Sequence, residues 1–142
     1  MAAAEFGAAA GAVDDAACAT LRVNRTDLRV LAAVASKGPM SASALAGAVG
    51  LSPAATTTAV QRLSAAGYVV RKVDSQDRRR ASVTVTEGAV AAIQSIYAPV
   101  AAAGHEVLAR YSDVELVVVE RFLREGVALQ HAQAERIRSL RR

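Results

Sequence analysis

The stretch from residue 41 to residue 86 constrains the fold most, because helix caps, turn signals and alternating strands follow one another within it. Ser41 can cap a short helix that Gly50 stops. The next residues, "LSP", place Ser52 as an N-cap and a proline at the first helical position, so a second helix is predicted over residues 53–66. Two helices joined by a tight glycine-containing turn form a helix-turn-helix.

Two short stretches of alternating side chains follow the second helix. Both "YVVRKVD" and "ASVTVT" alternate between two faces, and "SQDRRR" joins them, which predicts a β-hairpin. A helix-turn-helix followed directly by such a hairpin is a winged helix, with residues 74–80 as its wing. The expected fold class is mainly α with a small β-hairpin: a winged helix-turn-helix domain plus a helical dimerisation region.

Helical patterns flank the predicted winged helix on both sides. Residues 3–19 are rich in alanine, and a helix capped by Thr26 is predicted up to the following Gly-Pro break. Two long helices are predicted after Thr86, and a capping box of Ser112 and Glu115 opens the second.

The last predicted helix carries an apolar stripe that a small winged-helix monomer does not need to cover. A partner helix is therefore expected. The predicted organisation is an N-terminal dimerisation helix at 1–23, a winged helix-turn-helix domain at 24–88 and C-terminal dimerisation helices at 89–142. The stripe consists of Leu116, Val119, Leu123 and Val127, widened by Val118 and Phe122.

The net charge of +4 is concentrated in one part of the chain. Six basic and two acidic residues lie between residues 52 and 80, whereas the rest of the chain carries 11 of each sign. Such a cluster is typical of a surface that binds a polyanion, although a merely solvated basic surface would give the same count. The predicted wing, with three consecutive arginines, holds much of this charge.

The predicted helix 53–66 has two distinct faces. Thr56, Ala59 and Leu63 fall on one side at about 100° per residue and are expected to pack inward. The opposite face is polar and small, so it can approach base edges in a major groove, where Gln pairs with adenine and Thr offers a hydroxyl or contacts a thymine methyl. Ser52 is expected mainly as a cap, although a capped N-terminus also suits a phosphate. The candidate DNA-contacting residues here are Ser52, Thr57, Thr58, Gln61 and Arg62.

The segments "RTDLRVLAAV", "SASALAGAVGLSPAATTTAVQRLSAAGYVVRK" and "DSQDRRRASVTVTEGA", in this order, resemble the MarR family of bacterial winged helix-turn-helix transcriptional regulators. The strongest element is Asp77-Arg78-Arg79, followed by a strand, Thr86 and a glycine, as in the wing of that family. The resemblance covers about residues 24–90. It implies a dimer of winged-helix subunits, a palindromic double-stranded DNA operator and, in many members, a small-molecule or redox signal that releases the DNA.

The wing supplies the charged part of the predicted interface. A loop that reaches the phosphate backbone or a narrow minor groove should carry arginine. Arg78 and Arg79 match the family motif, and Arg80 adds a further positive charge. Asp77 has the wrong charge to touch DNA, and its place in the motif implies that it orients an arginine or closes the wing turn. The function expected from the resemblance is a dimeric, sequence-specific DNA-binding repressor that a small ligand releases.

Other residues of types that bind metals or ligands or take part in catalysis give weaker signals. His105 and His131 have no acidic or cysteine partner at ligand spacing, so no metal site is expected. Cys18 has no second cysteine and is expected to be a buried apolar residue rather than a peroxide sensor. Tyr97 and Tyr111 fit either a ligand pocket or the core. No nucleophile–base set, phosphate loop or carboxylate pair indicates an enzyme or a cofactor.

The alanine-rich N-terminus is expected to be an amphipathic helix rather than a signal peptide, because no basic residue precedes it and Glu5 interrupts it. No apolar run approaches the roughly 20 residues of a membrane span, so a soluble cytoplasmic protein is expected. One alternative function stays open: a winged-helix module used for dimerisation or protein contact, as found beside some methyltransferase domains. The wing arginines and the polar helix face argue against it.

Overall fold

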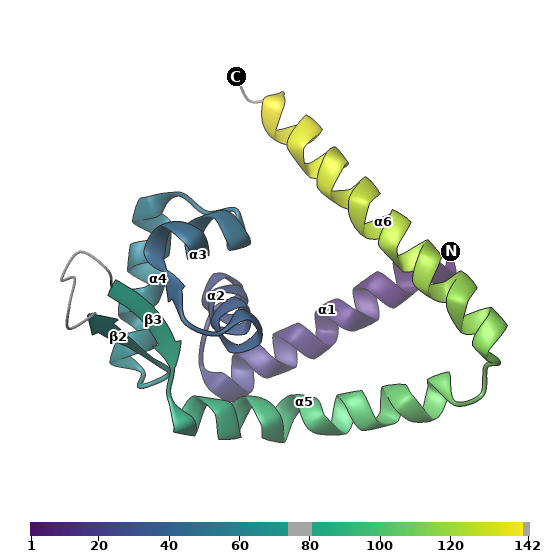
Figure 1. The fold of residues 1–142 in the computed structure, drawn as a ribbon, viewed down its shortest axis with the longest axis horizontal. Coiled ribbons are helices and arrows are strands. Elements are labelled where there is room, and N and C mark those ends of the chain that lie inside the picture. The colour runs from purple at the N-terminus through teal and green to yellow at the C-terminus, as the bar shows by residue number, and fades with distance from the viewer. Residues whose placement is uncertain (74–80, 141–142) are drawn as a thin grey trace. The chain divides into compact units, whose positions relative to one another are not determined.

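The computed structural model describes residues 1–73 and 81–140, so the predicted wing at 74–80 lies outside the described residues. The chain separates into two compact units, Met1–Tyr97 and Ala98–Arg142. Figure 1 labels the elements of both units along the ribbon. In chain order they are α1 (Ala2–Leu21), α2 (Arg25–Lys37), β1 (Met40–Ser41), α3 (Ala42–Val49), α4 (Pro53–Ala65), β2 (Val69–Val73), β3 (Ala81–Val85), α5 (Glu87–Leu108) and α6 (Asp113–Ser139).

The first unit contains a three-stranded antiparallel sheet in the order β1-β3-β2. The predicted hairpin is confirmed, with Val69 opposite Val85 at its base and Val73 opposite Ala81 next to the wing. The third strand, β1, pairs with β3 and was not indicated by the sequence pattern. A strand of two residues is too short for alternation to be visible, so only the fold reveals it.

An apolar cluster fills the first unit. Helix α2 contributes Leu28, Leu31 and Val34, which recur at helical spacing. Cys18 on α1 joins the same cluster and is 9 % exposed, as the expectation of a buried apolar residue requires. Both helices of the helix-turn-helix and the hairpin pack onto this cluster, so apolar contacts set the position of α4. Its buried members are Ala17, Cys18, Leu21, Leu28, Val30, Leu31, Val34, Leu45, Val49, Ala59, Leu63, Val69, Val83 and Ala89.

The start of α2 differs from the sequence-based expectation. The pattern predicts Thr26 as the N-cap, but this is wrong: Asn24 caps the helix, and its Oδ1 accepts the backbone N–H of Asp27 at 2.8 Å. Asn24 has the extended backbone of a cap, whereas Thr26 lies inside the first turn. Asparagine and threonine both cap helices well, so residue type alone did not separate them. As a consequence, Asp27 falls in the first turn of α2, where the helix dipole favours a negative charge.

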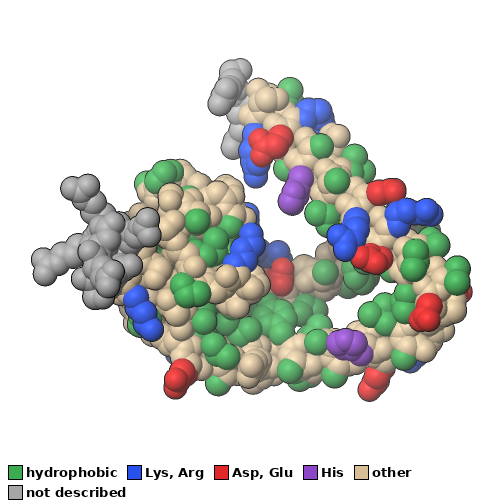
Figure 2. Space-filling view, viewed as in Figure 1, with side chains coloured by type: hydrophobic (Ala, Val, Ile, Leu, Met, Phe, Trp, Pro, Cys, Tyr) green, Lys and Arg blue, Asp and Glu red, His purple; other side chains and the backbone are tan. Residues whose placement is uncertain are grey.

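The second unit contains the end of α5 and all of α6. The predicted capping box of Ser112 and Glu115 is confirmed, and hydrogen bonds from Ser112 lower the pKa of the Glu115 carboxyl. No residue of α6 is buried, and apolar side chains are visible along this helix in Figure 2. Within the predicted stripe Phe122 is 64 % exposed and Val127 is 57 % exposed. None of the described helices is long and apolar enough to cross a membrane.

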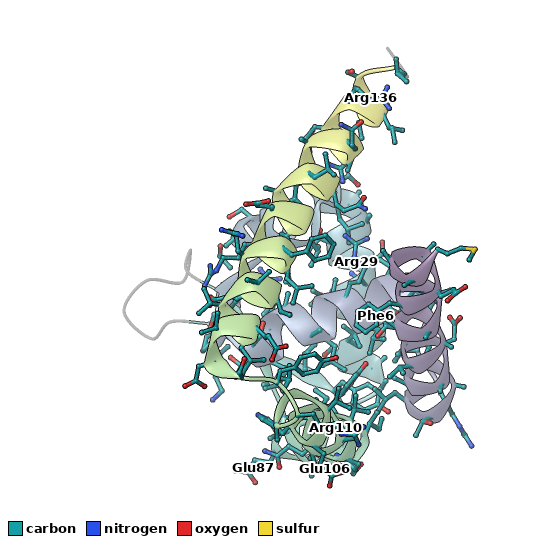
Figure 3. All side chains as sticks on the ribbon, turned by 90° about the vertical axis from the view of Figure 1, so that its right-hand side faces the viewer. Phe6, Arg29, Glu87, Glu106, Arg110 and Arg136 are labelled. Atoms are coloured by element: carbon teal, nitrogen blue, oxygen red, sulfur yellow. The ribbon has the colours of Figure 1, made fainter. Side chains whose placement is uncertain are left out.

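Helix α1 has two different halves. Ala17 and Leu21, near its C-terminus, are buried in the core of the first unit. Phe6, labelled in Figure 3, is 72 % exposed, and the surrounding alanine-rich turns are exposed as well. The N-terminal half of α1 therefore presents apolar surface. The predicted domain boundaries after residues 23 and 88 are not tested by these observations and stay predictions.

Candidate nucleic-acid interface

The helix-turn-helix is built by the caps that the sequence indicates. The hydroxyls of Ser41 and Ser52 each accept the backbone N–H three residues later, both at 3.2 Å. Gly50 has a φ of 63°, a left-handed conformation that glycine adopts most readily. The N–H of Leu51 then donates to the carbonyl of Ala46 at 3.1 Å. The turn between α3 and α4 is thus closed by its own backbone, and α4 begins at a defined point.

Helix α4 has the two faces that the periodicity predicts. Thr56, Ala59 and Leu63 are each at most 1 % exposed and pack into the core of the first unit. The opposite face is open to solvent over the length of the helix. This burial holds one side of α4 against the protein and leaves the other free. The five predicted contact residues on or before this helix, Ser52, Thr57, Thr58, Gln61 and Arg62, are all exposed.

The threonine hydroxyls of the exposed face already donate within the helix. The Oγ1 of Thr57 donates to the carbonyl of Pro53, and the Oγ1 of Thr58 donates to the carbonyl of Ala54, both at 3.0 Å. Each hydroxyl hydrogen is therefore used, while the oxygen can still accept a hydrogen bond. In a major groove such a threonine can accept from the amino group of adenine or cytosine, or place its methyl group against a thymine methyl.

Arg62 differs from its neighbours on α4 because its guanidinium is already paired. Its Nε donates to Asp27 Oδ2 at 2.9 Å and its Nη2 donates to Oδ1 at 2.6 Å. The Asp27 side chain is 4 % exposed and that of Arg62 is 47 % exposed. The hydrogen bond to Asp27 raises the pKa of Arg62 above its usual value. One edge of the guanidinium is thus directed into the protein.

The base of the predicted wing is anchored by two side chains. The hydroxyl of Thr86 donates to the carbonyl of Gly67 at 2.8 Å and accepts the N–H of Ala89 at 3.1 Å, so it also caps the start of α5. The hydroxyl of Tyr68 donates to the carbonyl of Leu21 at 2.9 Å. These bonds tie the hairpin to α1, α4 and α5 within the first unit. The described part of the hairpin is therefore fixed to the rest of the first unit.

The charged tip of the wing was predicted from sequence and is not described by the structure. On the described strand leading to it, Arg71 and Lys72 are both exposed. Positive charge is therefore present on the described part of the hairpin, toward the wing. The predicted residues Asp77, Arg78, Arg79 and Arg80 lie outside the described residues.

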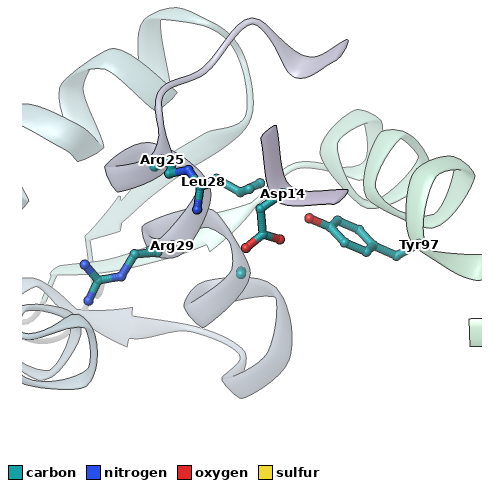
Figure 4. Close-up of a pocket in the computed structure, with 6 residues that line it drawn as sticks. Asp14, Arg25, Leu28, Arg29 and Tyr97 are labelled. Carbon is teal, nitrogen blue, oxygen red and sulfur yellow. The ribbon is translucent and has the colours of Figure 1, made fainter. Parts of the chain in front are cut away.

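A cavity of about 140 Å³ lies between α1, α2 and α5 in the first unit. Figure 4 shows the Tyr97 hydroxyl directed toward Asp14. Burial, followed by the Asp14 carboxylate, raises the pKa of Tyr97. Arg29 lines the cavity and also donates to the Val49 carbonyl at the end of α3. Of the two tyrosines considered for a pocket, Tyr97 lines this cavity, whereas Tyr111 is 47 % exposed. The lining residues are Asp14, Arg25, Leu28, Arg29, Ala32 and Tyr97.

Residues that could suggest metal or redox chemistry are dispersed. Cys18 is a free, buried thiol, and His105 bonds through Nδ1 to the carbonyl of Ala101 on its own helix at 2.8 Å. Across residues 1–73 and 81–140, no group of three or more His, Cys, Asp or Glu side chains is placed to hold a metal ion.

Asp27 is the site residue that the sequence analysis missed. A signal was present, because Asp27 occurs four and seven residues before Leu31 and Val34, in the buried stripe of α2. A carboxylate in such a stripe requires a hydrogen-bonded or charged partner, since an unpaired buried charge is costly. The partner, Arg62, could not be identified from spacing because it lies on another helix.

Comparisons with known proteins agree with the geometry of this site. Residues 23–80 match the model of the MarR family. The chain is 29 % identical over 123 residues to an uncharacterised HTH-type transcriptional regulator, YcgE, of Bacillus subtilis, covering 87 % of this chain and 80 % of that protein. These relatives are transcriptional regulators, in agreement with the expectation that the chain is not an enzyme.

Solved structures share the fold. A MarR-like transcriptional regulator of Thermotoga maritima is 29 % identical, with a TM-score of 0.63 over 76 % of this chain and 77 % of that one. RV1404 of Mycobacterium tuberculosis superimposes with a TM-score of 0.70 at 18 % identity, covering 88 % and 89 % of the two chains. MepR of S. aureus gives 0.71 at 12 % identity, covering 92 % and 97 %. The family match over residues 23–80 and the regulators that are 29 % identical make this chain similar to the MarR family of DNA-binding transcriptional regulators, and the structures of lower identity show that it shares their fold.

Proposed function

We propose that two copies of this chain form a dimer that binds a palindromic double-stranded operator. Helix α4 of each subunit enters the major groove, and the wing at 74–80 contacts the phosphate backbone or the adjoining minor groove. The observation that carries this proposal is the division of α4 into a buried face and an exposed polar face. A helix held in this way can present short side chains to base edges without losing its packing.

Each exposed residue of α4 has a role that follows from its chemistry. Gln61 reads a base, because its amide can both donate to and accept from adenine. Thr57 and Thr58 accept from amino groups or contact thymine methyl groups. Ser52 places the N-terminus of α4, with its free N–H groups and dipole, near a phosphate. Arg62 lies in the last turn of α4, at the edge of the proposed interface.

The wing supplies sequence-independent attraction. Arg78, Arg79 and Arg80 contact phosphates or a narrow minor groove, and Asp77 orients one of them. Binding of DNA by a protein of this fold is consistent with the proposal: an S. aureus MepR variant whose structure contains an oligodeoxyribonucleotide superimposes with a TM-score of 0.60 at 13 % identity.

Dimerisation is proposed from the apolar surface of α6. Val118, Phe122 and Leu123 are each at least half exposed within one continuous stripe. Exposure of this size on a single helix is typical of a surface that a partner covers. Two copies also match the two-fold symmetry of a palindromic operator.

Repression with release by a small molecule completes the proposal. A dimer bound to its operator excludes other proteins from that DNA. The proposed location of the protein is the cytoplasm, where the DNA is. The cavity lined by Asp14, Arg29 and Tyr97 is the proposed effector site, because Arg29 also contacts the end of α3. A ligand that changes this contact would alter the position of α3 and thereby the geometry of the helix-turn-helix.

The proposed function is tested by selecting operators from a random DNA library and measuring affinity by fluorescence anisotropy. The DNA upstream of the protein's own gene is measured in the same series. A triple variant with Thr57, Thr58 and Gln61 replaced by alanine should fold but lose preference for the selected DNA. Gln94→Ala, at an exposed position of α5, is the matched control and should bind as the unmodified protein does. Selection that yields no palindromic or preferred sequence would reject the proposal.

A further inference from the structure

The pair of Asp27 and Arg62 joins two helices with different tasks. Asp27 lies in the first turn of α2, in the core of the first unit, whereas Arg62 lies near the end of α4. The two oxygens of the carboxylate receive two nitrogens of one guanidinium, at 2.9 and 2.6 Å. This bidentate arrangement restricts both the distance and the relative orientation of the two groups.

The position of Asp27 is held by α2 itself, independently of Arg62. Asn24 accepts the Asp27 backbone N–H at 2.8 Å, and the carboxylate is stabilised by its place in the first turn of α2. Its side chain is 4 % exposed, so Asp27 cannot reach DNA while the pair is intact. The charge of Arg62 is balanced by a neighbour inside the protein.

Apolar packing determines which face of α4 is buried, and the ion pair adds a directional constraint on the rotation of the helix. Ala59 and Leu63 hold the helix against the core, but contacts of this kind have no preferred direction. A bidentate ion pair does have one. Gln61 is adjacent to Arg62 in sequence, so a small rotation of α4 about its axis changes where the Gln61 amide meets the bases.

We propose that Arg62 is a positioning residue rather than a DNA contact: its pair with Asp27 fixes the rotation of α4 and thereby sets which base the Gln61 face reads. This inference rests on the proposed function, because it assigns Arg62 a role within the same interface. It replaces the sequence-based expectation that Arg62 binds DNA directly. The two roles differ in their dependence on salt and on base sequence.

The test uses Asp27→Asn, Arg62→Gln and the double variant, each as the full chain. Arg62→Gln leaves a buried carboxylate without its partner and can unfold the protein. The double variant avoids this, because it removes both charges together and with them the bidentate ion pair. Arg124→Gln is the matched control, since Arg124 also donates through Nε and Nη2 to a carboxylate, both to Glu120 Oε1, on an exposed helix. Circular dichroism verifies the fold of each variant.

The measurement is the affinity for the selected operator and for its single-base variants, by anisotropy at several salt concentrations. All three pair variants should lower the discrimination at the Gln61 base position about tenfold, the size of one base contact. The slope of log affinity against log salt should stay as in the unmodified protein. The double variant should lose no more than either single variant, because the residues act as one unit. Arg124→Gln should change neither quantity.

Two results would overturn the inference. In the first, Arg62→Gln flattens the salt slope by about one unit per subunit and weakens all sequences equally, which would identify a phosphate contact. In the second, the folded double variant keeps full discrimination. If the unmodified protein shows no preference for any DNA sequence, the proposed function fails first, and the inference about Arg62 fails with it.

Discussion

Helices α4 and α6 are both amphipathic, but they place their apolar faces in opposite environments. In α4, Ala59 and Leu63 are buried and the exposed face is polar. In α6, Leu123 and Phe122 are more than half exposed, and no residue of the helix is buried. The apolar face of α4 is covered within one copy of the chain, and its polar face is exposed to solvent. Helix α6 lacks a cover for its apolar face.

This difference indicates the kind of partner that each helix requires. A polar face of small side chains next to a basic hairpin suits a hydrated, negatively charged surface such as DNA. An apolar stripe suits another protein surface, because burial of apolar area drives association. The same hydrophobic periodicity thus predicts a helix in both regions, and burial distinguishes their functions.

The largest expected effect is on the free energy of unfolding when Leu63 is shortened. Leu63→Ala should lower the free energy of unfolding by about 2–5 kcal/mol, because it leaves a cavity under α4. Leu123→Ala is the matched change on α6 and should leave the first unit's stability nearly unchanged. Urea denaturation at two protein concentrations measures both variants. Equal losses, independent of concentration, would contradict the difference between the two helices.

The next effect concerns dimerisation through α6. Leu123→Glu should raise the dimer dissociation constant by about a hundredfold or more, because each subunit loses the burial of a leucine side chain. Arg121→Glu adds the same group on the opposite side of α6 and should leave the dimer intact. Sedimentation velocity over a concentration series measures the constant. A folded, soluble monomer of the unmodified protein at micromolar concentration would contradict the proposed dimer.

The wing should affect affinity without affecting base discrimination. Arg79→Ala should weaken operator and unrelated DNA alike and flatten the slope of log affinity against log salt by about one unit for each lost phosphate contact in each subunit. If Arg79 lies in the minor groove instead, the loss should depend on A·T content at positions that α4 does not reach. Anisotropy titrations at several salt concentrations distinguish these cases. Unchanged affinity and slope would mean that the arginine is only solvated.

The smallest expected effect is at the N-terminus of α4. Ser52→Ala should lower the free energy of unfolding by about 1 kcal/mol, because the Ala55 N–H loses its side-chain acceptor. Ser64→Ala, in the exposed part of the same helix, should change stability much less. Thermal and urea unfolding of both variants measure the difference. Similar small changes in both would show that the cap contributes nothing specific.

Much of the fold could be predicted from local signals. The caps Ser41, Ser52 and Ser112 and the turn at Gly50 were all identified because capping depends on neighbouring residues. The prediction of Thr26 as a cap was wrong because Asn24, an equally suitable residue type, lies two residues earlier. The two-residue strand β1 could not be predicted, since the strand it pairs with, β3, comes about 40 residues later in the chain.

The candidate site could also be predicted only in part, because a single sequence shows the faces of a helix but not its contacts with other helices. The inward and outward faces of α4 follow from helical periodicity, which a single sequence contains. The pairing of Arg62 with Asp27 depends on a contact between two helices, so sequence spacing could not identify it. The roles of Gln61, Arg78 and Arg79 in DNA binding stay predictions.

The most direct test of the whole account is the sequence preference of the purified protein for its selected operator. We expect binding at least about a thousandfold tighter than to scrambled DNA of equal length at physiological salt. Gln61→Ala should lose about 1–3 kcal/mol of discrimination at one base-pair position in each half-site and keep it elsewhere. Equal affinity for operator and scrambled DNA, or a uniform loss across all single-base variants in Gln61→Ala, would contradict recognition through α4.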